Sequence, residues 1–63
     1  MQEWGFDLGA RVRDHVTGYV GTITARAEYL SGSRRYGVEM LDVDGKVREH
    51  WFDEARLVSE PPR

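Results

Sequence analysis

Apolar and polar residues alternate along most of this chain, and short glycine-containing segments divide the alternating stretches. These breaks fall at residues 17–18, 31–33 and 44–45. A repeat of two is typical of β-strands with one buried face, and Asp44–Gly45 is the strongest hairpin signal in the sequence. No helical stretch lies between the runs, so the pattern predicts a small all-β domain.

The alternation predicts five strands, at residues 10–16, 19–29, 34–41, 46–52 and 56–58. Gly21 lies inside the second strand and predicts a bulge or sharp bend, which lets one long strand serve two sheets. Asp53 can cap a single helical turn before the last strand. We therefore predict a five-stranded antiparallel barrel, closed where the first and last strands meet, with one short helical turn before the last strand.

The sequence predicts a lead-in, a folded domain and a flexible tail. Residues 1–7 form a lead-in, in which Trp4 and Phe6 share one face of an extended segment and can seal an end of the barrel. Residues 8–58 form the barrel itself. Residues 59–63 carry two prolines, which cannot continue a strand ladder, and are predicted to be a flexible tail.

Composition narrows the possible classes of protein. A 63-residue domain buries only about 60% of its unfolded surface, so it needs a well-packed core or self-association. The chain has no cysteine, and two histidines are too few to suggest a metal site, so no metal and no cofactor are predicted. No apolar run approaches the length of a membrane span, and no export signal is recognisable, so a cytoplasmic location is expected.

A group of arginines and tyrosines flanks the predicted loop at residues 30–33. Arg26, Arg34 and Arg35 with Tyr29 can bind an anion or nucleic acid, because guanidinium groups bind phosphate and tyrosine stacks on bases. The alternative is a solvated hairpin in which Arg26, Glu28 and Arg34 pair across strands. The formal charge of −2 does not favour nucleic acid as the partner.

A second group lies near the predicted helical turn and comprises His50, Phe52 and Asp53. The alternation assigns Trp51 to the core and Phe52 to the opposite face, where Phe52 and His50 form an apolar patch for a partner or a second copy. The alternative is that Phe52 plugs one end of the barrel. His50 and its neighbour Glu49 point to opposite faces, so they cannot cooperate in proton transfer, and no catalytic residue is predicted.

The chain resembles SH3-like small barrels over residues 8–58. The resemblance lies in residues 8–13 and 18–23, which are similar to the "GxxVxV…GxxGxV" opening of many such barrels. More narrowly, residues 17–30, 36–38 and 51–57 resemble a group of small proteins from phages, prophages and mobile elements. That group has no settled biochemical role, so the resemblance implies a fold and an origin.

One enzyme family has a similar architecture. Residues 9–14 resemble the "GDRVRKKSG" stretch of type II plasmid-borne dihydrofolate reductase, an SH3-like barrel in which four protomers build one NADPH-dependent active pore. That family has a Val-Gln-Ile-Tyr run where this chain has residues 48–52, and a pore lysine where it has Asp14. The functional motifs do not carry over, and a shared fold alone does not imply a shared function.

The sequence thus predicts a non-catalytic interaction module that binds itself or another protein. A nucleic-acid-binding barrel and a homotetrameric reductase are the two alternatives. The predicted interaction residues are Arg26, Tyr29, Arg34, Arg35, His50, Phe52 and Asp53.

Overall fold

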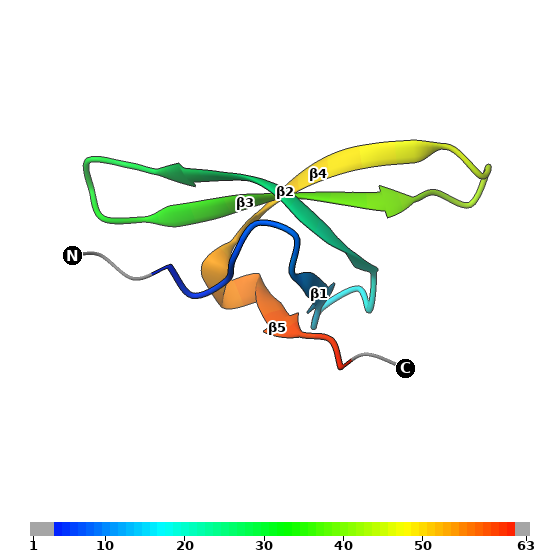
Figure 1. Cartoon of the computed structure of the whole chain (residues 1–63), viewed down its shortest axis with the longest axis horizontal. Coiled ribbons are helices and arrows are strands. Elements are labelled where there is room, and N and C mark those ends of the chain that lie inside the picture. The colour runs from blue at the N-terminus through cyan, green and yellow to red at the C-terminus, as the bar shows by residue number, and fades with distance from the viewer. Residues whose placement is uncertain (1–3, 62–63) are drawn as a thin grey trace.

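The structure is a computed structural model and describes residues 4–61. Its elements are β1 (Arg11–Asp14), β2 (Val20–Glu28), β3 (Arg34–Leu41), β4 (Val47–Asp53), the 3-10 turn η1 (Glu54–Arg56) and β5 (Leu57–Ser59). Each strand lies within its predicted range or extends one residue beyond it. The all-β class, the five strands and the single helical turn before the last strand are confirmed (Figure 1).

The five strands form one antiparallel sheet in the order β4-β3-β2-β1-β5. The predicted meeting of the first and last strands is confirmed, because Arg13 of β1 pairs with Val58 of β5. Among residues 4–61, β4 and β5 are the unpaired ends of this order, and η1 links them covalently. The sheet is thus curled but not closed by hydrogen bonds, an arrangement compatible with a small barrel.

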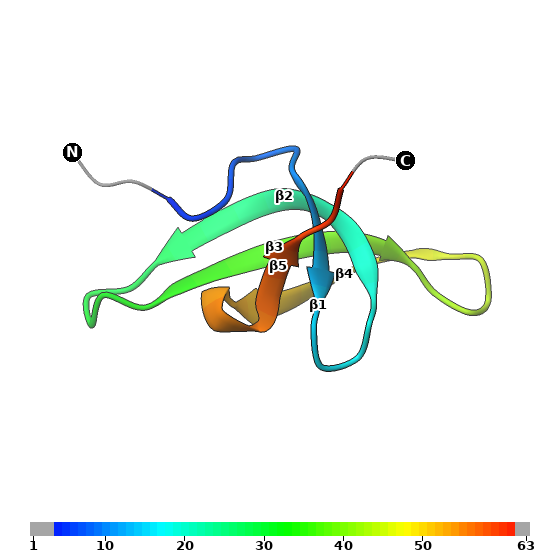
Figure 2. The ribbon, with the colours of Figure 1, turned by 90° about the horizontal axis from the view of Figure 1, so that it is seen from below.

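Two hairpins give the molecule its length. The β2–β3 hairpin extends to one side and the β3–β4 hairpin to the other (Figure 1), along a long axis of 38 Å. Figure 2 shows β1 and β5 lying across the middle of these long strands. The tips of both hairpins therefore lie away from the core, where less of each strand is covered.

A β-bulge in β2 changes which side chains face the core. The register shifts between Ile23 and Ala25, so Thr24 is an extra residue in β2. After the shift, Arg26 pairs with Tyr36, whose side chain is buried. Directly paired residues share a face, so Arg26 lies on the same side of the sheet as Ile23. Without the bulge, the alternation of an uninterrupted strand would place these two residues on opposite faces.

Gly21, the predicted site of the bulge, lies two residues before this shift and permits a close approach of two strands. A Cβ atom at Gly21 would lie 2.5 Å from the carbonyl oxygen of Glu39 and 2.6 Å from Cγ1 of Val38. Only glycine fits this position without movement of β3.

The core lies between the long strands and the β1–β5 pair. Its buried side chains are Val12, Ile23, Tyr36, Val38, Met40 and Leu57. Trp4 and Phe6 of the lead-in both pack against this cluster, consistent with the shared face predicted for them. Both rings meet Tyr36 edge-on, with centroids at 5.9 and 5.4 Å. Such edge-to-face pairs add to the stabilisation from burial.

The face assignment in β4 is wrong. Phe52 pairs with Tyr36 and packs against the core, whereas Trp51 is 40% exposed on the outer face. Trp51 lies over Gly37 of β3, where an added Cβ would come within 3.1 Å of Cζ2 of Trp51. Phe52 therefore contributes to the core, as in the alternative that made it a plug.

A buried ion pair joins β1 to the turn before β5. The Asp14 carboxylate is 1% exposed and accepts hydrogen bonds from Nε and Nη2 of Arg56 at 2.8 and 2.7 Å. The hydroxyl of Thr17 donates to the same carboxylate at 2.5 Å, and the backbone N–H groups of Val16 and Thr17 donate at 3.3 Å. The bonds from Arg56 hold the pKa of Asp14 far below its usual value, against the opposing effect of burial.

The C-terminal segment is tied to β1 further than predicted. Ser59 pairs with Val12, and the backbone N–H of Glu60 donates to the carbonyl of Arg11 at 3.0 Å. Glu60 also forms an ion pair with Arg13 at 3.1 Å. The predicted flexible tail therefore does not begin at residue 59; its last two residues, and residues 1–3 of the lead-in, lie outside the described range.

Candidate interaction surface

The predicted arginine group is divided between the two faces of the sheet. Arg26 and Arg34 lie over the ring of Trp4, with their guanidinium carbons 4.7 and 5.3 Å from its centroid. Arg34 also forms an ion pair with Glu28 at 3.5 Å, as the solvated-hairpin alternative predicts. These cation–π contacts fix the lead-in on the core side of the β2–β3 hairpin.

Arg35 lies on the outer face, because it alternates with Arg34 and Tyr36 along β3. It forms an ion pair with Asp53 at 3.2 Å and donates to the carbonyl of Trp51 at 3.2 Å. The structure thus brings together one residue from each predicted group, Arg35 and Asp53. The three arginines do not form one contiguous basic patch.

The remaining predicted residues are spread over different places. Tyr29 is exposed at the end of the β2–β3 hairpin, where its backbone N–H donates to the carbonyl of Ser33 at 2.9 Å. His50 is exposed on β4, with its ring centroid 6.4 Å from that of Phe52. The predicted apolar patch is wrong, because Phe52 is turned to the core and His50 alone is left exposed there.

Tyr36 and Glu54 form the other polar contact at the core. The phenol of Tyr36 donates to Oε2 of Glu54, and the backbone N–H of Gly5 donates to the same oxygen at 3.2 Å. Burial, together with the neighbouring carboxylate, raises the pKa of Tyr36 above its usual value. The phenol of Tyr36 therefore acts as a neutral hydrogen-bond donor that attaches η1 to β3, and Glu54 attaches the lead-in to η1.

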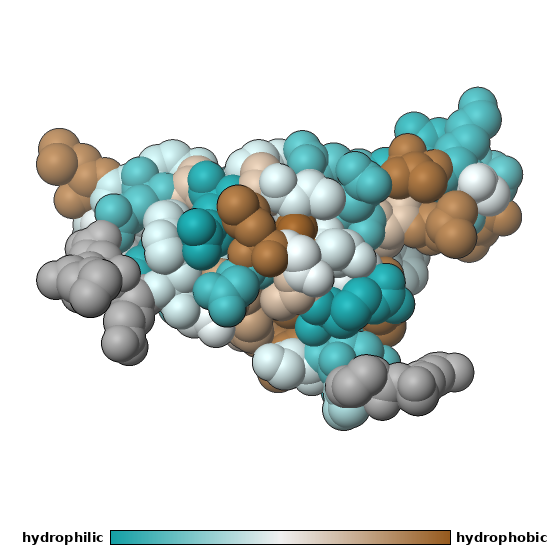
Figure 3. Space-filling view, in the orientation of Figure 1, coloured by the Kyte–Doolittle hydropathy of each residue, from teal (hydrophilic) through white to brown (hydrophobic). Residues whose placement is uncertain are grey.

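Sequence reasoning missed a cluster of exposed aliphatic side chains at the β3–β4 hairpin. We call it the aliphatic surface; it comprises Leu41, Val43 and Val47 of this hairpin, together with the half-buried Val20 of β2. Leu41 is 71% exposed, Val47 is 61% exposed and Val43 is fully exposed. Figure 3 shows apolar side chains gathered at this end of the molecule. Three of these residues lie beside the Asp44–Gly45 turn. This position could have indicated their exposure, because strands close to a hairpin tip extend past the core.

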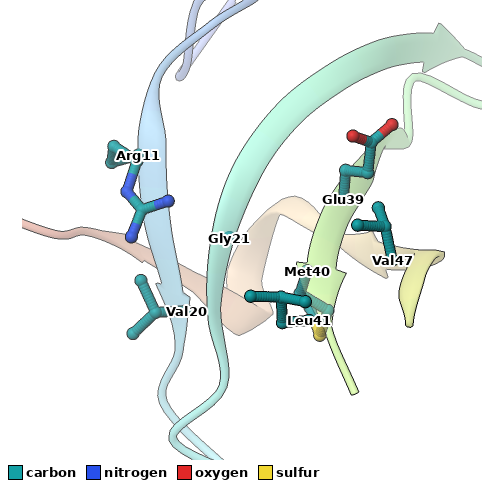
Figure 4. Close-up of a pocket in the computed structure, with 7 residues that line it drawn as sticks. All are labelled: Arg11, Val20, Gly21, Glu39, Met40, Leu41 and Val47. Carbon is teal, nitrogen blue, oxygen red and sulfur yellow. The ribbon is translucent and has the colours of Figure 1, made fainter. Parts of the chain in front are cut away.

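A hollow of about 250 Å³ lies beside the aliphatic surface, where β2 diverges from β3. Its lining residues are Arg11, Val20, Gly21, Glu39, Met40, Leu41 and Val47. Figure 4 shows Arg11 and Val20 on one side of the hollow, Glu39 and Val47 on the other, and Leu41 between the two sides. The site thus has an apolar centre with one positive and one negative group at opposite rims.

The titratable side chains of the described residues are engaged in local contacts or lie apart from one another. Within residues 4–61, no group of three or more histidine, cysteine or acidic side chains is placed to hold a metal ion. His15 contacts the carbonyl of Ala55 through Nε2 at 3.0 Å, and the most perturbed carboxylate, Asp14, is occupied by Arg56. In the described part of the chain, no helix is long and apolar enough to cross a membrane.

Comparison with known proteins gives no family. No protein-family model matches the chain, and no curated protein sequence matches it significantly.

Proposed function

We propose that this protein is a non-catalytic interaction module that binds a protein partner through the aliphatic surface. The observation that carries the proposal is the clustering of Leu41, Val43 and Val47 in exposed positions at one hairpin. Single exposed aliphatic residues are ordinary, whereas an apolar patch with charged rims is typical of a binding site. Covering such side chains is favourable at about 25 cal/mol per Å² of apolar area removed from water.

The size of the domain adds to this argument. Six hydrophobic side chains are buried among the described residues, whereas ten large ones are exposed, and three of these ten meet at the β3–β4 hairpin. A chain with so small a core gains proportionately more from covering an aliphatic surface than a large protein does. The absence of barrel closure between β4 and β5 also leaves the β3–β4 hairpin accessible from the side of β4.

The alternatives have less support. For nucleic acid, Arg26 and Arg34 are occupied by Trp4, and Arg35 lies on the other face beside Asp53. For the type II reductase, no observation beyond the small-barrel architecture favours the activity. An origin in a phage or mobile element, which the sequence resemblance implies, is part of our proposal and is tested by the genes that neighbour this one.

Site-specific photo-crosslinking in the cells that express the protein tests the proposed function. A photoreactive amino acid replaces Val43, and the matched control carries it at Leu30, which is equally exposed at the tip of the other hairpin. We expect covalent protein adducts at Val43 in clear excess over Leu30. Equal yields at the two positions, or no adduct at Val43, would contradict the proposal.

A further inference from the structure

We propose that the partner of the aliphatic surface is a second copy of this chain. Two copies pair about a two-fold axis, so that Arg11 of each copy meets Glu39 of the other and the aliphatic side chains meet at the centre. This inference rests on the proposed function and adds to it the identity of the partner and the residues that select it.

Two opposite charges, those of Arg11 and Glu39, flank the aliphatic side chains of the hollow. Arg11 comes from β1 and Glu39 from β3, on opposite sides of the hollow (Figure 4). When two identical surfaces face each other about a two-fold axis that lies between them, perpendicular to the line from Arg11 to Glu39, the Arg11 side of one copy meets the Glu39 side of the other. The cation of each copy then faces the anion of its partner, and two equivalent ion pairs form.

Within residues 4–61, neither Arg11 nor Glu39 has an ion-pair partner. Within the described range, the side chain of Arg11 has one hydrogen bond, a long one of 3.4 Å to the hydroxyl of Thr22. Glu39 lies directly opposite Glu49 in the β3–β4 ladder, and two like charges in that position repel. None of the ion pairs among residues 4–61 includes Arg11, Glu39 or Glu49. An external cation at Glu39 would relieve the repulsion.

Other ligands fit the aliphatic surface less well than a second copy does. A nucleic acid would bring phosphates toward both Glu39 and Glu49, which is unfavourable. A partner that carries charges of one sign only would attract either Arg11 or Glu39 and repel the other. A second copy carries both charges and its own aliphatic side chains, so it can pair with both Arg11 and Glu39 and cover the apolar side chains at the same time.

The interface is small, so the association is expected to be reversible. Four aliphatic side chains and two ion pairs are typical of weak complexes, which we expect to assemble between about 10 and 500 μM. Sedimentation velocity over this range measures the monomer–dimer equilibrium of the complete chain.

Two charge reversals provide the decisive test. The Arg11→Glu variant and the Glu39→Arg variant each place like charges at both rims, so each alone is expected to weaken dimerisation at least about tenfold. An equimolar mixture of the two variants is expected to restore the dimer, because each variant supplies the charge that the other's reversed position needs. Rescue by mixing occurs only when the two residues meet across an interface between copies.

Two further variants serve as controls. Asp7→Arg makes the same change of charge as Glu39→Arg at an exposed position that does not line the hollow, and it should leave dimerisation unchanged. Leu41→Glu should abolish dimerisation, and no mixture with the charge reversals should restore it. Circular dichroism of each variant shows whether the fold is retained.

A chain that is monomeric over the whole concentration range would overturn the inference. So would dimerisation that persists in both single variants, or a mixture that stays monomeric. If another protein were then captured at Val43, the interaction module would stand without the homodimer. If crosslinking at Val43 also gave nothing, both proposals would fail.

Discussion

Replacing Asp14 tests the buried ion pair that holds β1 to the segment before β5. The Asp14→Asn variant keeps the shape of the side chain but removes its charge and one of its two carboxylate oxygens. Arg56 then loses its paired acceptor, and the hydroxyl of Thr17 loses its charged partner. The change is confined to groups that the structure shows in direct contact.

The magnitude follows from the burial of the two partners. Removing one member of a buried ion pair typically costs about 3–5 kcal/mol. The side chain of Arg56 is 40% exposed and can regain water, so the cost falls below this range, and we expect a loss of about 2–3 kcal/mol. A domain of 63 residues has about 3–9 kcal/mol of total stability. Asp14→Asn should therefore lower the melting temperature by about 10–20 °C.

Urea unfolding followed by far-UV circular dichroism measures this loss. The matched control is Asp44→Asn, which removes an exposed carboxylate that pairs with Arg48 at 3.3 Å and should cost under about 0.5 kcal/mol. A loss for Asp14→Asn no greater than that of the control would refute the reasoning.

The ion pair of Asp14 with Arg56 also makes the free energy of unfolding depend on pH. The pKa of Asp14 is lower in the folded chain than in the unfolded chain, so the unfolded state binds more protons at acid pH. The stabilisation is complete above the unfolded pKa, near 4, and is lost progressively as the pH falls toward the folded value. Asp14→Asn should flatten the stability profile below about pH 4 relative to the parent chain. Parallel profiles for the two proteins would contradict this assignment.

Three further outcomes follow from the fold. Gly21→Ala should cost about 1–3 kcal/mol in urea unfolding, because the new Cβ would lie 2.5 Å from the carbonyl of Glu39; an unchanged midpoint would contradict the close approach. Phe52→Ala should cost about 2–3 kcal/mol and Trp51→Ala under about 1, since Phe52 packs on the core and Trp51 lies outside it; the reverse order would contradict the observed faces of β4. Labelled single- and double-stranded oligonucleotides should show no salt-dependent binding; affinity that falls steeply with salt would favour the nucleic-acid alternative.

Strand positions were predictable because they depend on local signals. The alternation and the glycine turns placed all five strands to within a few residues, and Trp4 and Phe6, whose spacing gives them a shared face, both pack against the core of the sheet. The face assignments failed where they depend on tertiary structure. The extra residue at Thr24 has no marker in the sequence and reverses the phase of β2, which carries Arg26 to the core side.

The candidate site was harder to predict than the fold. In β4, Val47 and Trp51 alternate with Phe52, and the sequence alone favours the face with two apolar residues as the buried one. In the structure only Phe52 of β4 is partly buried, because it pairs with Tyr36, whereas Val47 and Trp51 are exposed on the outer face. Exposure of this kind depends on where the core ends, and the alternation of apolar and polar residues does not indicate that position.

Hydrogen–deuterium exchange at low and at high protein concentration tests the central claim most directly. Pairing of two copies through the aliphatic surface predicts that protection rises with concentration in residues 39–47 and around Arg11, and stays constant in the β2–β3 hairpin tip. Protection that is independent of concentration, or that rises at residues 29–33 instead, would contradict the account.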